Sequence, residues 1–63
     1  MDREEWVKEV KIALIRKGKT VSQMAREMEY TSAYIYATLG GNHPRQDMVD
    51  KISAYAGIEP IKL

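Results

Sequence analysis

Apolar residues recur at three- and four-residue spacing along most of the chain, the spacing of helices that bury one face. The first such stripe consists of Trp6, Val7, Val10, Ala13 and Leu14. It predicts an amphipathic helix over residues 4 to 17, with Gly18 supplying its end. Ile12 and Ile15 fall off the centre of this stripe, so one of them lies under a neighbouring element or at a subunit contact.

The segment TVSQMAREM predicts a second, shorter helix at residues 20 to 28. Thr20 can cap its N-terminus, and Gln23 can reach back to Thr20, which together form a capping box. The apolar face of this helix consists of Val21, Met24, Ala25 and Met28. Ala25 is small and sits in the middle of that face, where another helix could approach closely.

The segment TSAYIYATLGG predicts a third helix at residues 32 to 39. Thr31 is its expected N-cap, and Gly40 with Gly41 provides the stop. Ile35 and Leu39 are four residues apart and point to the core together. The segment contains no Arg, Lys, Asn or Gln, which matters for the function considered below.

Tyrosines cluster around this third helix. Tyr30 is expected to be buried beneath the turn that precedes it. With Ile35 facing inward, Tyr34 and Tyr36 fall on the two flanks of the helix and are at least partly exposed.

A fourth helix and a short tail complete the chain. The buried face of the helix consists of Met48, Val49, Ile52, Tyr55 and Ala56, and Gly57 closes it. In the tail, residues 58 to 63, Ile58, Ile61 and Leu63 fit an edge strand, a strap across the core or a dimer contact. With no strand pattern elsewhere, we predict a single all-α domain over residues 1 to 63, a four- to five-helix bundle with short connections.

The composition narrows the function classes. The chain has 63 residues, a net charge of +1 and no cysteine, so it cannot use disulfides or a thiolate metal site. Its longest apolar stretch is far shorter than the roughly 20 residues of a membrane span, and its N-terminus is too charged for a signal peptide, so a cytoplasmic chain is expected. His43 is the only histidine, and Asp47 with Asp50 is best explained as charge at a helix start. We therefore expect no enzyme, no cofactor and no metal.

The charges are unevenly distributed. Residues 2 to 9 hold four acids, whereas residues 10 to 26 hold five cations and no acid. This basic stretch runs into the second and third helices. It fits a nucleic-acid partner, and it equally fits a solvated helix face with cations near a helix C-terminus.

Two short helices joined by about three residues, at residues 20 to 39, form a helix-turn-helix pattern, whose second helix lies in the DNA major groove. With its flanks, VKIALIRKGKTVSQMAREMEYTSAYIYATLGGNHP and ISAYAGI, the chain resembles the Cro and repressor-like (Xre) family of phage and bacterial DNA-binding proteins. The resemblance covers residues 10 to 58 and implies a lambda-repressor-like fold. The turn departs from the family because Glu29 stands where a left-handed glycine is usual, so the turn is either reshaped or slightly strained.

The resemblance also implies DNA contacts. The residues expected to face the groove are Thr31, Ser32, Ala33, Tyr36 and Ala37. Those expected along phosphates are Ser22 and Gln23 before the turn, and Asn42, His43 and Arg45 after the third helix. Lys17, Lys19, Arg26 and Arg45 would supply the salt-sensitive part, and Tyr34 with Tyr36 would place hydroxyls on phosphates.

Two hypotheses remain for the third helix. In the first, a homodimer binds duplex DNA in a sequence-selective way as a transcriptional regulator of phage or mobile-element type, associated with the nucleoid. This helix lacks the Arg, Lys, Asn or Gln side chains that form two hydrogen bonds to one base. Selectivity then rests on contacts with thymine methyl groups and on DNA shape. In the second, the same surface binds a partner repressor as an antirepressor does, since aromatic residues are enriched and lysine is depleted at protein interfaces.

Overall fold

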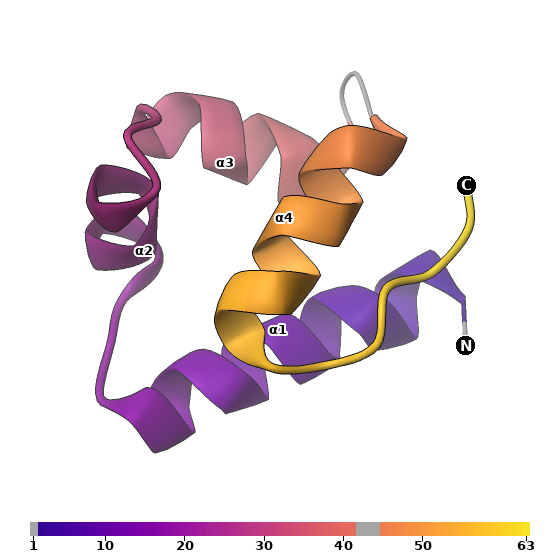
Figure 1. Ribbon diagram of the computed structural model, residues 1–63, viewed down its shortest axis with the longest axis horizontal. Coiled ribbons are helices and arrows are strands. Elements are labelled where there is room, and N and C mark those ends of the chain that lie inside the picture. The colour runs from indigo at the N-terminus through magenta and orange to yellow at the C-terminus, as the bar shows by residue number, and fades with distance from the viewer. Residues whose placement is uncertain (1, 42–44) are drawn as a thin grey trace.

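The computed structural model describes residues 2–41 and 45–63, and this part of the chain forms four α-helices (Figure 1). α1 spans Arg3–Lys17, α2 spans Val21–Glu27, α3 spans Ser32–Gly40 and α4 spans Gln46–Ala56. The described residues contain no β-strand. The predicted all-α fold is confirmed.

The core lies between α4 and the other three helices. It is built from Trp6, Val10, Leu14, Met24, Ala25, Ile35, Leu39, Met48, Val49, Ile52 and Ile61. Trp6 is completely buried, and its indole Nε1–H donates to the Ser53 hydroxyl at 2.8 Å. This bond satisfies two buried polar groups at once and joins α1 to α4.

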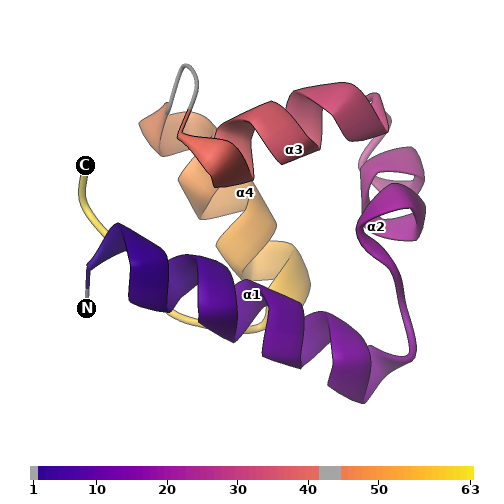
Figure 2. The same ribbon diagram turned by 180° about the vertical axis from the view of Figure 1, so that it is seen from behind.

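The helices pack mainly as two pairs, α1 with α4 and α2 with α3. Figure 2, seen from behind, shows α1 and α3 in front of α4, with α2 at one end of the molecule. α4 therefore packs behind the other helices, and the face of α3 that points away from α4 is exposed to solvent.

The predicted capping residues are confirmed, although α2 is shorter than predicted and Gly40 lies inside α3, which ends at Gly41. Thr20 and Gln23 form the capping box, with the Gln23 N–H donating to the Thr20 hydroxyl and the Thr20 N–H donating to the Gln23 amide oxygen. Thr31 accepts from the Tyr34 N–H at 3.1 Å and so caps α3. Gly18 ends α1 in the left-handed conformation.

The tail is a strap, one of the three forms considered from the sequence. Ile61 is buried in the core, whereas Leu63 is exposed. Gln46, the first residue of α4, holds the tail at two points: its Nε2 donates to the Ile61 carbonyl at 2.7 Å, and its Oε1 accepts from the Leu63 N–H at 2.9 Å. One side-chain amide thus binds the tail backbone as a neighbouring strand would.

Three side chains are less buried than the sequence suggested. Tyr55, predicted on the buried face of the fourth helix, packs against the core but is only half-buried, because it lies beside the solvated Glu27. Tyr30 was expected to be buried beneath the turn but is only half-buried, because its hydroxyl extends to the exposed amino group of Lys51. Met28 packs against the core without being enclosed by it. Neither Ile12 nor Ile15 lies under a neighbouring element, since they are 41% and 76% exposed on α1.

Candidate nucleic-acid interface

α2 and α3 are joined by a short turn, as the sequence predicted. Ala25 and Ile35 are both buried where the two helices meet. In the turn, the Glu29 N–H donates to the Arg26 carbonyl at 3.1 Å and the Tyr30 N–H donates to the Ala25 carbonyl at 2.8 Å. These bonds tie the turn back to the last residues of α2.

Glu29 adopts the left-handed conformation, with φ at 65°, and it is the only non-glycine residue with a positive φ in the described chain. The turn is therefore not reshaped: it keeps the left-handed conformation usual for glycine, and Glu29 is strained. An L-residue there costs roughly 1 to 2 kcal/mol. The fixed turn sets the direction in which α3 leaves α2.

One side of α3 is anchored in the molecule. Ile35 and Leu39 are buried as expected, and Thr38 is buried with them. The Thr38 hydroxyl donates to the Tyr34 carbonyl at 3.0 Å, so its polar group is satisfied within the helix. This side of α3 is unavailable to any partner.

The other side of α3 faces solvent. Thr31, Ala33 and Tyr36 are exposed, and Ser32 and Ala37 are partly exposed. Tyr36 is the most prominent of them, with 57% of its surface accessible. The five residues expected to face a DNA groove are therefore accessible from outside.

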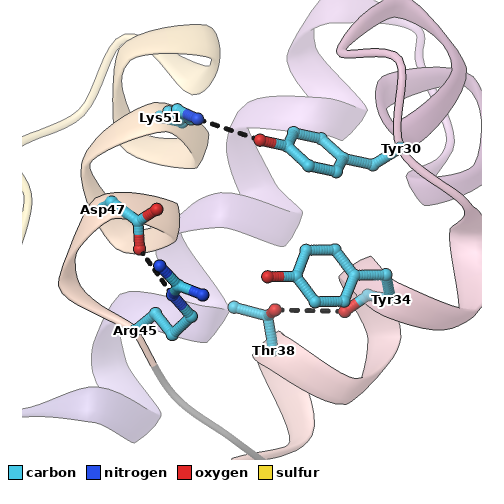
Figure 3. Close-up of polar contacts among 6 residues, drawn as sticks. All are labelled: Tyr30, Tyr34, Thr38, Arg45, Asp47 and Lys51. Atoms are coloured by element: carbon cyan, nitrogen blue, oxygen red, sulfur yellow. Dashed lines mark hydrogen bonds and ion pairs between the residues drawn. The ribbon is translucent and has the colours of Figure 1, made fainter.

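Tyr34 lies apart from this face. Its ring contacts the ring of Tyr30, with centroids 5.4 Å apart, and packs against the core (Figure 3). Lys51 of α4 completes the cluster, since its Nζ donates to the Tyr30 hydroxyl at 2.9 Å and lies 5.6 Å from the centre of that ring. The hydrogen bond with Tyr30 raises the pKa of Lys51. Tyr34 is thus mainly a packing residue between α3 and α4, a role that its position in the sequence did not reveal.

The candidate phosphate-binding cations differ in their surroundings. Arg26 is exposed on α2, next to the exposed Ser22 and Gln23. Lys19 forms an ion pair with Glu27 at 3.0 Å, and Arg45 forms one with Asp47 at 3.0 Å. Both pairs are largely solvated and therefore weak, so they can exchange for phosphate at little cost.

The Lys19–Glu27 pair perturbs both of its members. The hydrogen bond with Glu27, and then its negative charge, raise the pKa of Lys19. The same hydrogen bond lowers the pKa of Glu27. Tyr55 of α4 lies beside this pair, and burial raises the pKa of its phenol, followed by the hydrogen bond with Glu27.

The C-terminal end of α3 is held by a contact that sequence analysis missed. Arg3, at the start of α1, donates from Nη2 to the Leu39 carbonyl at 2.6 Å. Its guanidinium also lies against Gly41, where an added Cβ would come within 2.7 Å of Nη2. The contact supplies a cation to the negative end of the helix dipole. The partners are separated by 36 positions in the sequence, which explains why no local pattern indicated the contact.

Two predicted contacts, Asn42 and His43, lie outside the described residues. Within the described ranges, no cluster of His, Cys, Asp and Glu could hold a metal ion. The described helices are all too short or too polar to cross a membrane.

Comparison of the chain with protein-family models, with curated proteins and with solved structures found no match.

Proposed function

We propose that this chain is a DNA-binding protein that places the exposed face of α3 in the major groove. The observation that carries the proposal is the joining of α2 and α3 by a turn with a left-handed residue, with one side of α3 anchored and the other accessible. The resemblance to Cro and repressor-like proteins points the same way. A homodimer that acts as a transcriptional regulator is the form that suits a reading helix this short.

The chemistry of the exposed face suggests how selectivity would arise. Ala33 and Ala37 can meet thymine methyl groups, and the Ser32 hydroxyl can bond a base edge or a phosphate. Tyr36 can pack its ring on sugar and reach a phosphate with its hydroxyl. Selectivity would lean on methyl contacts and on DNA shape.

Binding to random duplex DNA at two salt concentrations tests the proposal. If two to four of the candidate cations each neutralise one phosphate, log affinity falls with a slope of about −1.8 to −3.6 against log salt. Raising salt from about 50 to about 200 mM should then weaken binding roughly 12-fold to 150-fold. Fluorescence anisotropy with a labelled duplex gives these affinities directly, and absence of binding at the lower salt would reject the proposal.

Arg26 gives a sharper test of the interface itself. Arg26→Ala should reduce the steepness of the salt dependence by about 0.9 per protomer, because one phosphate contact is lost. Lys62→Ala is the matched control, since it removes an exposed cation from the tail, at the opposite end of the molecule from α2 (Figure 1). Equal effects of the two substitutions would show that binding is not directed to α2 and α3.

Protein binding through the same face is the second candidate function. The exposed ring of Tyr36 favours it, because large aromatic side chains are enriched at the centres of protein interfaces. Tyr36→Ala separates the two functions once a preferred duplex has been selected from a random pool. Weaker binding of that duplex, with random DNA unaffected, would assign the ring to base readout.

A further inference from the structure

A groove opens where the second half of α1, the start of α2 and the exposed face of α3 meet. Its volume is about 380 Å³. The residues that define its character are Lys11, Leu14, Ile15, Lys19, Val21 and Tyr36. Three helices therefore contribute to one surface feature, separate from the tyrosine cluster of Figure 3.

The groove is apolar within and open at its edge. Leu14 is buried and Val21 is half-buried, so they form its inner part. Ile15 and Tyr36 are among the few large apolar side chains that the described chain leaves exposed, and both line this groove. Ile12, three residues before Ile15 and therefore beside it on α1, is also exposed. Large apolar side chains exposed close together are typical of interaction sites.

The charge beside the groove is positive. Lys11 forms no ion pair in the described part of the chain, and Lys19 has a single, solvated partner in Glu27. Arg16, next to Ile15, is also exposed, and residues 10 to 26 contain no acid. A complementary partner must bring carboxylates to the edge and apolar side chains to the interior.

We propose that this groove binds an acidic amphipathic helix of a partner protein. A helix lying in a groove between helices is an established recognition mode, read by apolar residues at i, i+3, i+4 and i+7. Strand addition has no sheet edge to use in the described chain. Duplex DNA could reach the lysines, but its sugars and phosphates do not match an interior formed by Leu14 and Val21.

A second copy of this chain fits less well than a separate partner. The exposed acids Glu4 and Glu5 precede Trp6, which is fully buried, so they present no apolar neighbour there. Leu63 is the remaining exposed large apolar residue of the described chain, and Lys62 precedes it. Glu9 and Ile12 are exposed together on α1, but Lys8, Lys11 and Arg16 of the same helix are exposed as well, so α1 does not offer the excess of carboxylates that the groove requires.

The groove and the proposed DNA-reading face share Tyr36. A helix seated against this ring would occupy one flank of α3 and compete with a duplex for it. Docking itself does not depend on DNA binding, whereas the competition rests on the proposed function. The partner would then act as a displacing regulator.

A designed peptide of roughly 15 residues, with leucines at the four anchor positions and glutamates on both flanks, is the probe. We expect saturable anisotropy of the labelled peptide, and amide shifts in NMR spectra centred on Lys11, Ile15, Val21 and Tyr36. The same peptide with lysines in place of glutamates should bind at least about tenfold more weakly. Equal binding of the two peptides, or no binding up to about 1 mM, overturns the proposal.

Two pairs of variants locate the contact. Ile15→Ser should lower the affinity for the acidic peptide about tenfold or more. Leu63→Ser, at another exposed apolar residue, should leave that affinity within about twofold. Lys11→Glu should lower the affinity for the acidic peptide and raise the affinity for the basic one, whereas Lys62→Glu should change neither affinity. All four positions are exposed, so the fold should tolerate these changes. Equal effects at groove and tail overturn the proposal.

A competition experiment keeps the two proposals distinct. If labelled duplex binds, the acidic peptide should release it, and Ile15→Ser should prevent the release while DNA affinity is retained. If no duplex binds but the peptide does, the DNA-binding proposal fails and the groove proposal stands. If Ile15→Ser instead weakens the duplex and leaves the peptide unaffected, the groove belongs to DNA and the peptide proposal is overturned.

Discussion

Replacing Glu29 with glycine should stabilise this domain, although it removes a side chain from a turn. Glu29 has φ at 65° and an exposed side chain that forms no hydrogen bond or ion pair within the described residues. The left-handed conformation costs an L-residue about 1 to 2 kcal/mol and costs glycine nothing comparable. Glycine also makes the unfolded chain more flexible, which lowers the free energy of unfolding by about 0.4 to 1 kcal/mol.

The net gain should be about 0.5 to 1 kcal/mol. For a domain of this size, each kcal/mol shifts the unfolding midpoint by about 4 to 8 °C, so the Tm should rise by about 2 to 8 °C. Thermal unfolding followed by circular dichroism measures the change, with urea unfolding as the check at constant temperature.

Glu29→Ala is the matched control, because alanine removes the same carboxylate but keeps the strain. It should bring no gain in Tm. If alanine stabilises as much as glycine, the effect comes from the lost charge and the strain argument is wrong. A lower Tm for the glycine variant would equally refute it.

Three further outcomes follow from named contacts. Ser53→Ala leaves the Trp6 indole N–H buried without a partner and should cost about 1 to 3 kcal/mol in urea unfolding; an unchanged midpoint would contradict this. Arg3→Met removes the hydrogen bond to the Leu39 carbonyl at the C-terminal end of α3, so amide hydrogen exchange should quicken in the last turn of α3 and not in α2. The hydrogen bond with Lys19 lowers the pKa of Glu27 from its ordinary 4.5. Ionised Glu27 therefore stabilises the folded state above that pH, and this stabilisation is lost as the pH falls through the folded pKa. Glu27→Gln should therefore flatten the acid limb of a plot of Tm against pH.

Local signals carried most of the fold prediction. The capping box of Thr20 and Gln23, the cap at Thr31 and the stop at Gly57 each depend on residues close together in the chain. Their chemistry is decided by that spacing, whatever the rest of the molecule does. α2, α3 and the turn between them were predictable for this reason, since they are assembled almost entirely from such short-range features.

Contacts between distant segments could not be predicted in the same way. The hydrogen bonds from Arg3 to Leu39 and from Gln46 to Ile61 depend on how the helices pack together. Tyr34 illustrates the effect on the candidate site. Tyr34 is partly exposed, as its helical position predicted, but its contact with the ring of Tyr30 depends on packing and was not predictable.

The division of α3 into an anchored side and a solvent side makes this domain a natural scaffold for selection. Ile35, Thr38 and Leu39 hold the helix in place, and none of them belongs to the outward set. Ala33 and Tyr36 can therefore be randomised together while the residues that secure the fold stay untouched. Different residues of the same nine-residue helix therefore secure the fold and face solvent, so the outward residues can vary without loss of stability.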